Sequence, residues 1–600
     1  MLLKLSLTGL KGRWRDYAVL FSGLMIAAGI FYMFQSMASN DDFLSSNSPV
    51  AMTAIIFQLG SVLLAIITLV YILYANSFLM SMRQKDYAMF MMLGAKQRKI
   101  ALLIFIETFI IGLLATILGS AIGVGLSSIV SKLLTNQLDI QVTNFSVFSS
   151  KALLITLVFF TILFLLAATI NASSIVKKPI LSLLKANETP TASRRRPVIL
   201  SLEAVGGIVL LGIGYYMMDN IAKIGLLALI IALITIVLGS YFVFHSVMIF
   251  VLNLLKRSDN LRLKKLNNFT LSQLSFRIQD YTKMLSMVSI IFALALGALT
   301  VGLGFHNEIP KMTEQTSTYD LLLNNAQDAD QKQVENLNPT LDVSYQLKED
   351  KNTIYFNQEQ FDEEPLNAIY YDTTPKKTTY SGKELANDEA KMDSLRTLLL
   401  PEQQEKELSM VPEDKFRSLS QQTSSLQVVQ VKDFMAQKDR IQKIVTENIK
   451  QNPSLAQGQF AMNQKYDIYN LYNETFSGLE FMGFFLGIAF LTMLASCLMF
   501  KILSGAASDV VRYDMLNKIG TRMSLLKKSI RKEIAVLFLA PGILGAIHVL
   551  FGLKMFTSLL TEPYAGIWLP FLIFFVLYLL YYFLTIWLYT DIVLKKKESS

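Results

Sequence analysis

The sequence predicts an α-helical integral membrane protein with ten transmembrane helices, arranged as two parallel four-helix repeats plus two linker helices, and one α+β extracellular domain. Composition sets this class, because 52% of the 600 residues are hydrophobic and only 17% are charged, whereas typical soluble domains carry about 25% charged residues. So apolar a chain is not intrinsically disordered. The single cysteine, Cys497, excludes an internal disulfide framework.

Ten apolar stretches predict the spanning helices. A helix needs about 20 apolar residues to cross the hydrocarbon core of a bilayer. The stretches that meet this length cover roughly residues 17–37, 54–79, 100–130, 152–172, 200–217, 224–254, 284–305, 479–503, 533–560 and 567–589. The first is longer than the apolar region of a normal signal peptide, so we expect a spanning helix there.

The distribution of Lys and Arg predicts the orientation of these spans. Basic residues gather before the first stretch, after the last and in every second loop, whereas the loop 38–53 holds Asp41 and Asp42 and no basic residue. Because cytoplasmic loops carry the excess of Lys and Arg, we expect both termini to be cytoplasmic. The net charge of +9 does not indicate nucleic-acid binding, since no polar domain collects the basic residues beside aromatic side chains.

Residues 306–478 differ from the rest of the chain and predict an extracellular domain. They contain 18 Lys and Arg against 28 Asp and Glu, a formal charge of −10, while the remainder carries +19. They follow the seventh span, which places them outside, and about 170 residues is the size of one domain. The segments 352–357 and 368–372 are typical of strands and 431–449 is typical of a helix, which indicates an α+β fold.

Two short patterns recur along the chain and indicate an internal duplication. Residues before the first span recur before the seventh at an offset of 264, and residues before the third span recur before the ninth at an offset of 426. The two offsets differ by about as many residues as the extracellular domain has in excess of the loop 38–53, which occupies the equivalent place after the first span. The matched residues are Arg13, Asp16 and Tyr17 with Arg277, Asp280 and Tyr281, and Tyr87, Met89, Leu93, Gly94 and Glu107 with Tyr513, Met515, Ile519, Gly520 and Glu533.

The duplication divides the chain into five parts. We expect a first four-helix unit at 1–175, linker helices at 176–262, the seventh span at 263–305, the extracellular domain at 306–478 and the remainder of the second four-helix unit at 479–600. Both units begin on the cytoplasmic side. They are therefore parallel repeats, unlike the inverted repeats of many secondary transporters.

The loop 83–100 predicts a short amphipathic helix between two spans, with Met89, Met92 and Leu93 on one face and Gly94 at the turn that follows. Two interpretations stay open: a helix lying on lipid headgroups, or a coupling element that docks onto a cytoplasmic partner. Its recurrence favours a partner with two equivalent sites. The candidate coupling residues are Asp86, Tyr87, Met89, Leu93, Gly94, Tyr513, Met515, Ile519 and Gly520.

Glu107 and Glu533 each lie near the start of a long span. A carboxylate in the membrane is costly and usually faces protein or water. The pair either transmits movement through interhelical contacts or reaches toward lipid headgroups, and the sequence leaves both possibilities open. We find no catalytic constellation, no phosphate-binding glycine loop and no metal-ligand spacing among the three histidines, His245, His306 and His548.

These features resemble the FtsX-like permease family of ATP-binding-cassette transporters. The family motif, an acidic residue followed after eight positions by Gly and then basic residues, corresponds to Asp86, Gly94 and Lys96 to Lys99, and the segment 178–185 resembles the family's exit from its fourth span. The second repeat departs from the motif, since Arg512 stands at the acidic position. Ten spans with one large outer domain are similar to the bacitracin-resistance (BceB-type) subfamily of Gram-positive bacteria.

The resemblance implies the function. Two copies of a separate ATPase subunit would supply ATP and Mg, with no cofactor in this chain, and the permease would release cell-wall-targeting peptide antibiotics from undecaprenyl-linked precursors in the plasma membrane. It also implies contact with membrane lipids and a sensor histidine kinase. The ligand site is expected within 306–478, at residues that the sequence does not identify.

Two other functions remain open. One is mechanical signalling that regulates cell-wall hydrolases without peptide removal, as in division-linked members of the family. The other is export of lipoproteins or macrolides, which an unfused ten-span chain fits less well.

Overall fold

The computed structural model of the chain describes residues 14–39, 48–138, 148–176, 197–264, 266–326, 328–371, 375–451, 464–557 and 559–594. Arg13 and the segment 178–185, which carry two of the sequence predictions, lie outside these ranges. The chain forms two compact units, one comprising residues 1–305 and 477–600 and the other residues 306–476. We call the first the membrane unit and the second the inserted domain.

Ten helices in the described residues are long and apolar enough to cross a membrane, which confirms the ten predicted spans. The protein is therefore a multi-pass membrane protein. The helices are α2 (Trp14–Ala38), α4 (Ser48–Met92), α5 (Gln97–Leu138), α6 (Ser150–Val176), α8 (Pro197–Asp219), α10 (Leu226–Phe242) with its continuations η1 (Val243–Val247) and α11 (Met248–Arg257), α13 (Asn267–Thr316), α21 (Lys465–Lys518), α22 (Met523–Gly552) and α23 (Trp568–Leu594). Short helices α9 (Ile221–Ile224), α12 (Asp259–Arg262) and η3 (Leu553–Phe556) lie in the connections.

The first copy of the repeat consists of α2, α4, α5 and α6. Its closest approach is between α2 and α5, where a Cβ atom on Gly119 would lie 2.5 Å from the Met25 carbonyl oxygen and one on Gly123 would lie 2.5 Å from the Gly29 carbonyl oxygen. Small residues let helix backbones touch in a membrane, where no hydrophobic effect drives the helices together. Any larger side chain at these glycines would separate α2 from α5.

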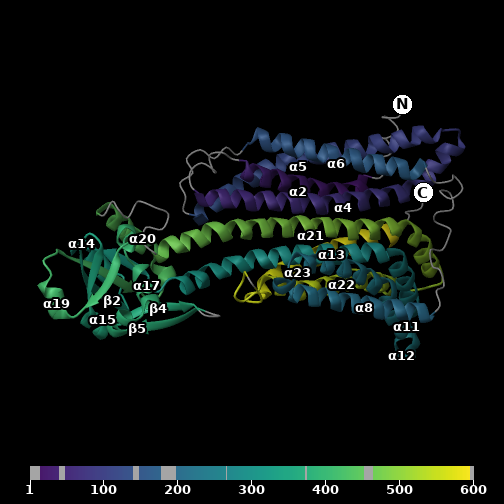
Figure 1. Cartoon of the computed structure of the whole chain (residues 1–600). Coiled ribbons are helices and arrows are strands. Elements are labelled where there is room, and N and C mark those ends of the chain that lie inside the picture. Colours follow the sequence, from purple (N-terminus) through teal and green to yellow (C-terminus); the bar gives the residue numbers. More distant parts are fainter. Residues whose placement is uncertain are drawn as a thin grey trace. The chain divides into compact units, whose positions relative to one another are not determined.

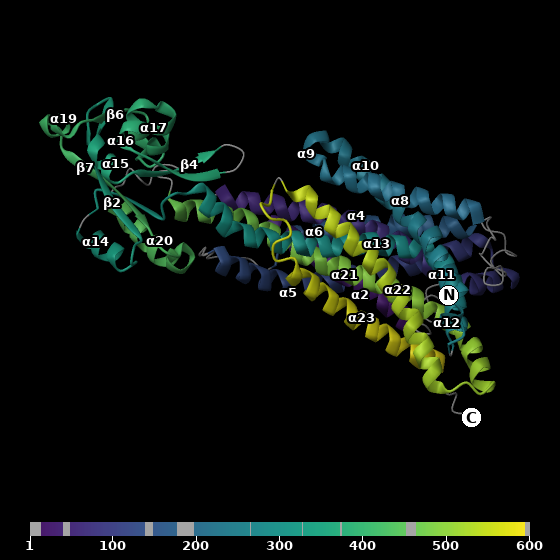
Figure 2. The same ribbon diagram turned by 90° about the horizontal axis from the view of Figure 1, so that it is seen from below.

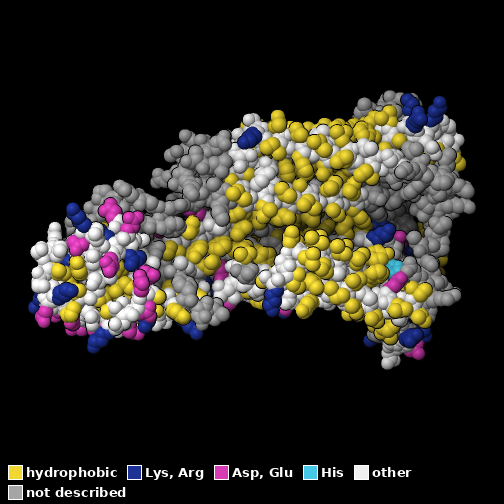
Figure 3. Space-filling view, in the orientation of Figure 1, with side chains coloured by type: hydrophobic (Ala, Val, Ile, Leu, Met, Phe, Trp, Pro, Cys, Tyr) yellow, Lys and Arg dark blue, Asp and Glu magenta, His cyan; other side chains and the backbone are white. Residues whose placement is uncertain are grey.

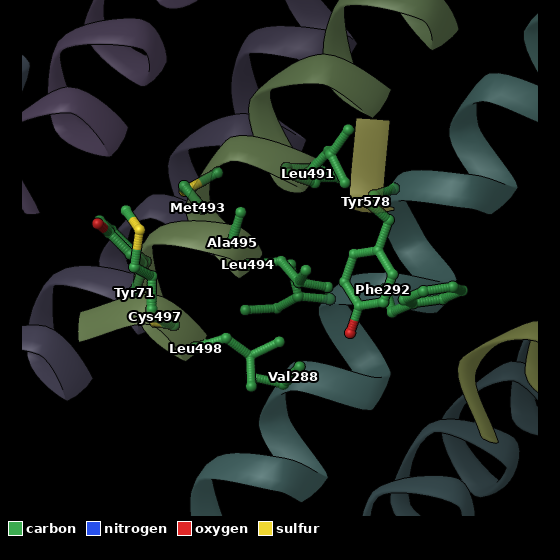
Figure 4. Packing of buried hydrophobic residues seen from close by; sticks show 14 of the residues in the cluster. Tyr71, Val288, Phe292, Leu491, Met493, Leu494, Ala495, Cys497, Leu498 and Tyr578 are labelled. Carbon is green, nitrogen blue, oxygen red and sulfur yellow. The ribbon is translucent and has the colours of Figure 1, made fainter. Parts of the chain in front are cut away.

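The second copy consists of α13, α21, α22 and α23, and its helix α21 lies at the centre of the membrane unit (Figure 1). The hydroxyl groups of Tyr71 on α4 and Ser496 on α21 are 2.8 Å apart. On the other side of α21, Leu494 and Leu498 point toward Val288 and Phe292 of α13 (Figure 4). Helix α21 therefore packs against both copies at once.

The linker helices α8 and α10 form a hairpin that turns through α9 (Figure 2). His548 joins this hairpin to α22, because its Nδ1 is 2.7 Å from the Tyr215 hydroxyl on α8 and its Nε2 is 2.9 Å from the Ser240 hydroxyl on α10. Both ring nitrogens are thereby hydrogen-bonded. Within the described residues, no group of three or more His, Cys, Asp and Glu side chains could hold a metal ion.

Hydrophobic side chains cover much of the face of the membrane unit that Figure 3 shows, and many large apolar side chains of the spanning helices are exposed. Helix α23 indicates the thickness of the surrounding membrane through the separation of its two Trp residues. The side chains of Trp568 and Trp587 are both about two-thirds exposed. The two residues are 19 positions apart, which corresponds to about 29 Å of helix and is close to the ~30 Å thickness of the hydrocarbon core. Tryptophan is enriched at both membrane interfaces, so these residues mark the two ends of the span.

The inserted domain is an α+β fold, as the sequence predicts. A five-stranded sheet has the order β1-β7-β2-β3-β6, in which β3 and β6 are parallel and the other neighbours are antiparallel; β4 and β5 form a separate hairpin. The strands are β1 (Leu321–Asn324), β2 (Leu341–Glu349), β3 (Thr353–Asn357), β4 (Leu366–Tyr371), β5 (Pro375–Tyr380), β6 (Glu407–Val411) and β7 (Thr423–Gln430). The helices are α14 (Asp328–Glu335), α15 (Gln358–Glu363), α16 (Gly382–Asn387), α17 (Glu389–Arg396), α18 (Pro401–Gln404), α19 (Glu413–Ser418) and α20 (Phe434–Gln451).

The sheet of the inserted domain has an apolar cluster on each face. Leu321 and Val429, which are paired neighbours on β1 and β7, pack with Ile441 and Ile444 of α20. The next pair along these strands, Leu322 and Val428, belongs to the cluster on the other face. Side chains alternate between the faces of a strand, so one short apolar run supplies both clusters, and the domain folds without a disulfide.

A buried ion pair fixes the start of α21 to the rest of the inserted domain. The Lys465 ammonium is 2.6 Å from Asp320 Oδ1 and also pairs with Glu314 near the end of α13. The other oxygen of Asp320 accepts the backbone N–H of Val431 at 2.7 Å. Lys465 and Asp320 are both buried, so each charge depends on the other for compensation.

We predict that Lys465→Met destabilises the inserted domain by about 3–5 kcal/mol, because removing one partner leaves the buried Asp320 carboxylate uncompensated. Lys377→Met is the matched control, since Lys377 is 2.9 Å from Glu314 but is exposed, and surface pairs contribute about 1 kcal/mol or less. Hydrogen exchange of β1 and β7 amides in the full chain measures both. Equal exchange in the two variants would contradict the assigned role of Lys465.

Candidate functional site

The candidate site consists of two helical hairpins at equivalent positions of the repeat. Hairpin 1 covers residues 83–107, where α4 turns into α5, and hairpin 2 covers residues 509–533, where α21 turns into α22. The turns occupy residues 93–96 and 519–522. The short separate helix predicted in this loop is wrong, because α4 continues without a break to Met92. No Gly or Pro interrupts residues 79–92, so nothing ends the helix earlier.

The two turns have the same backbone geometry. In hairpin 1 the N–H of Gly94 donates to the Met91 carbonyl at 3.1 Å and the N–H of Ala95 donates to the Phe90 carbonyl at 2.9 Å. These are the two hydrogen bonds of a Schellman motif. The same bonds in hairpin 2 run from Gly520 to Asn517, at 2.9 Å, and from Thr521 to Leu516, at 3.1 Å.

Gly94 and Gly520 both have φ of +93°, a conformation that costs other L-residues steric strain. A Cβ atom at either glycine would meet nothing within 4 Å. The requirement for glycine is therefore conformational and does not arise from close packing. This confirms the prediction that Gly94 permits the turn into the third span, and it shows that the repeat extends to backbone geometry.

The predicted coupling residues divide into exposed and buried sets. Leu93 and Ile519, at equivalent positions, are 86% and 76% exposed. Met89 and Met515 are also exposed, at 50% and 58%. Exposed apolar side chains that gather in one place mark interaction surfaces. We call these two equivalent pairs, Met89 with Leu93 and Met515 with Ile519, the hairpin tips.

Tyr87 and Tyr513 lie on the inner side of the hairpins and are almost fully buried. Tyr87 packs with Ile100 and Ile104 in a small apolar cluster between α4 and α5. The Tyr513 hydroxyl donates to Glu533 Oε2 at 3.2 Å, and burial raises the pKa of this phenol above its ordinary value. These two tyrosines therefore stiffen the hairpins and are not presented to a partner.

Glu107 is buried at the base of hairpin 1 and pairs with Arg83, whose guanidinium donates to both carboxylate oxygens. Arg83 is also 3.9 Å from Asp86 and lies 5.1 Å from the centre of the Tyr87 ring. The interpretation in which Glu107 reaches lipid headgroups is therefore wrong. The carboxylate instead joins the end of α4 to the beginning of α5.

Glu533 occupies the same position in hairpin 2, where it is 1% exposed, and reaches a different arginine. Arg277 Nε, on α13, is 2.6 Å from Glu533 Oε1, and the same guanidinium donates to Asp509 on α21. The Tyr589 hydroxyl of α23 donates to Asp509 Oδ2 at 2.7 Å. One polar cluster thus connects all four helices of the second copy, and the headgroup interpretation is wrong for Glu533 as well.

The two hairpins carry the same charge pair in opposite order. Arg83 and Asp86 in hairpin 1 are replaced by Asp509 and Arg512 in hairpin 2, and the second pair is 3.2 Å apart. This exchange explains why Arg512 departs from the motif. Asp509 stands in hairpin 2 where Arg83 stands in hairpin 1, and the cation in contact with Glu533 is Arg277 of α13.

Sequence reasoning missed Arg83, Asp509 and Tyr589, and it used Arg277 only as a marker of the repeat. One signal was present: aligning the copies at the offset of 426 places Arg83 opposite Asp509 and Asp86 opposite Arg512. A reciprocal exchange of charges three residues apart on a helix indicates two side chains that interact with each other.

The comparisons with known proteins agree with this arrangement. Residues 58–180 match the family described as FtsX-like permease C-terminal, a region that contains hairpin 1. The bacitracin export permease protein BceB of Halalkalibacterium halodurans is 22% identical over 92% of each chain. The ABC transporter permease protein YxdM of Bacillus subtilis is 23% identical, also over 92% of each chain.

This chain therefore resembles BceB permeases along nearly its whole length. A second BceB, from Bacillus subtilis, is 24% identical over 54% of this chain. That alignment covers 52% of the B. subtilis BceB. A further relative, the uncharacterized ABC transporter permease YvcS of Bacillus subtilis, is aligned over 47% of its length. The chain therefore matches about half the length of these two relatives. The family match covers α4, α5 and α6 of the first copy from residue 58 onward and does not include the second copy. Hairpin 2 is matched to the first copy by its own geometry.

We predict that Arg277→Met lowers the stability of the membrane unit by about 3–5 kcal/mol, because it leaves Asp509 and Glu533 buried without their shared cation. Arg512→Met is the comparison variant: it removes a half-exposed partner of the same Asp509 and costs about 1 kcal/mol or less. Thermal unfolding of the purified chain in detergent checks the difference. A larger loss for Arg512→Met would show that the cluster is not held by Arg277.

Proposed function

We propose that this chain is the membrane subunit of an ATP-driven ABC transporter that confers resistance to cell-wall-targeting peptide antibiotics. It would release the peptides from lipid-linked cell-wall precursors. Similarity over 92% of the chain to a protein named bacitracin export permease supports the proposal. The structural observation that carries it is the pair of matched hairpins, which give one chain two equivalent sites for a soluble partner.

The proposed partner is a separate ATPase subunit, two copies of which bind one permease chain and hold ATP and Mg. Each copy would seat on one hairpin tip, and the exposed Leu93 and Ile519 would enter apolar pockets of the two ATPases. The sequence has no phosphate-binding loop of the G-x-x-x-x-G-K-[ST] type. In this proposal the energy comes from the separate ATPase, with the hairpins as the points of entry.

Force would pass from the hairpins into the spans through rigid elements. Glu107 with Arg83, and Glu533 with Arg277, fix each turn to the helices on both sides of it. Helix α21 then runs without interruption from hairpin 2 to Lys465 in the inserted domain. Its 54 residues measure about 80 Å, and in this proposal the helix would carry a displacement at the hairpin to the domain.

The inserted domain is the proposed site of peptide or precursor binding. Residues 306–478 carry a formal charge of −10, and many peptides that attack cell walls are cationic. Charge of this kind guides encounter more than it sets affinity. In this proposal the domain is extracellular, both termini are cytoplasmic, the host is a Gram-positive cell, and a sensor histidine kinase reads the activity of the transporter.

We predict that Leu93→Asp and Ile519→Asp each reduce the number of bound ATPase copies from two to one, and that the double variant binds none. A charge at the tip cannot enter an apolar pocket without a large desolvation cost. Leu263→Asp is the control, because Leu263 is also an exposed leucine but follows the short helix α12, outside both hairpins. Native mass spectrometry of the co-expressed complex gives the count, and two copies in the double variant would refute the docking surface.

Removing the gene should lower the inhibitory concentration of bacitracin or lantibiotic-type peptides, and the wild-type gene should restore it. The double hairpin-tip variant is the control that keeps the inserted domain but lacks the energy source, and it should not restore resistance. Unchanged inhibitory concentrations across a panel of such peptides, together with a cell-wall hydrolase bound to residues 306–478, would favour mechanical signalling instead.

A further inference from the structure

The two copies differ in how their first and third helices meet. In the first copy a Cβ atom on Gly119 of α5 would lie 2.7 Å from Ala28 Cβ of α2. The same contact in the second copy joins Gly545 of α22 to the ring of Phe292 on α13, at 2.4 Å from Cδ1. These positions are equivalent at the offsets of 264 and 426. Phenylalanine in place of alanine holds α22 away from α13.

The separation of these helices leaves an apolar groove of about 310 Å³ between α13, α22 and α23. Its walls include Phe292, Gly542, Ala546, Phe574 and Tyr578, and at its mouth Leu539, Ile543 and Phe575 are each more than half exposed. Figure 4 shows Phe292 beside Tyr578 at the inner wall. The groove therefore opens on the outer surface of the span and is lined by aromatic and aliphatic side chains.

A basic cleft of about 570 Å³ continues from one end of the groove. It is lined by Lys527, Lys528, Arg531 and Lys532, and it shares Ala535 and Tyr582 with the groove. All four cations are exposed. Lys532 donates to Asn267 Oδ1 at 2.8 Å, and in the described part of the chain no ion pair is present at the other three.

The fold does not require these cations. At the equivalent positions of the first copy, α5 has Ala101, Leu102, Phe105 and Ile106, yet both helices begin at the same point of the repeat and turn through the same backbone geometry. The four cations next to an apolar groove are therefore present in α22 and not at the equivalent positions of α5. This combination fits a ligand with one anionic and one apolar part.

We propose that the cleft and groove together bind one anionic phospholipid, with its headgroup phosphate against Lys528 and Arg531 and an acyl chain along the groove. From Ala535 to Ala546 the groove measures about 17 Å along α22, close to half of the ~30 Å hydrocarbon core, which is the depth of one leaflet. Basic pockets beside spanning helices bind anionic headgroups. An acidic protein or free phosphate would use the cleft but leave the groove empty.

This site does not depend on the ATPase, since its residues lie outside both hairpin tips. Tyr582 is positioned at the boundary between the two halves of the site, where its hydroxyl donates to the Arg531 carbonyl at 3.3 Å. It lies five residues from the exposed Trp587, which marks the end of the span. The cations therefore lie at the level of lipid headgroups, as the proposal requires.

The test uses the full chain purified in detergent and supplied with equal amounts of phosphatidylglycerol and phosphatidylcholine of identical acyl chains. Native mass spectrometry then measures which lipid stays bound. The wild type should retain phosphatidylglycerol preferentially. Lys528→Gln combined with Arg531→Gln should reduce that preference by about tenfold or more, given the contribution of each cation near a headgroup.

Two further variants separate a phospholipid from other ligands. Ala546→Phe fills the groove and keeps all four cations, so it should also lose phosphatidylglycerol. Lys256→Gln with Arg257→Gln makes the same change in net charge at the end of α11 and should retain it. Inorganic phosphate at the concentration of the lipid should not displace phosphatidylglycerol from the wild type.

Three results would overturn the proposal. Equal retention of both lipids by the wild type would exclude a headgroup site, and unchanged retention in Ala546→Phe would exclude the groove. If Lys528→Gln with Arg531→Gln kept its lipid but lost a bound ATPase copy, the basic cleft would be a protein-docking surface.

Discussion

The arrangement of both hairpins depends on a buried carboxylate at the same place in each copy. Glu107 and Glu533 lie nearly three turns after the starts of α5 at Gln97 and α22 at Met523. An unpaired charge there would cost several kcal/mol, so each carboxylate must meet a cation. In the first copy that cation is Arg83, which belongs to the preceding helix of the same hairpin. In the second it is Arg277, which belongs to α13. The ion pair of Glu107 therefore joins the two helices of hairpin 1, and the contacts of Glu533 make hairpin 2 part of a four-helix cluster.

The four-helix cluster of hairpin 2 restricts how movement would pass through the second copy. A hairpin fixed through Arg277, Asp509 and Tyr589 cannot rotate without α13 and α23, because each of these side chains comes from a different helix. Helix α21 shares the cluster and also packs against Tyr71 of α4. Within the membrane unit, helix α21 therefore joins the second copy to the first, and the same helix begins at Lys465 of the inserted domain.

The sequence was sufficient for features that depend on local pattern. An apolar stretch of about 20 residues crosses a membrane as a helix, so the ten stretches predict ten helices. The alternation of residue types predicts the strand at 353–357. Gly94 and Gly520 were recognisable because a left-handed turn needs glycine. The loop helix was wrong because an amphipathic segment after a span fits a separate helix and a continued one equally well. The polar cluster was out of reach, since Arg277 and Asp509 are 232 residues apart and the register that brings them together is a property of packing.

The pair of helices in closest contact also differs between the two copies. In the first copy glycines bring α2 against α5, while Phe34 and Phe57 space α2 from α4. In the second copy Gly302, Gly483 and Gly487 bring α13 against α21, and Phe292 spaces α13 from α22. The pair now in close contact is the one whose two helices lead into the inserted domain, at Glu314 and Lys465. Close contact between α13 and α21 supports a domain that is inserted between these two helices. The groove beside α22 is the space left where Phe292 separates α13 from α22.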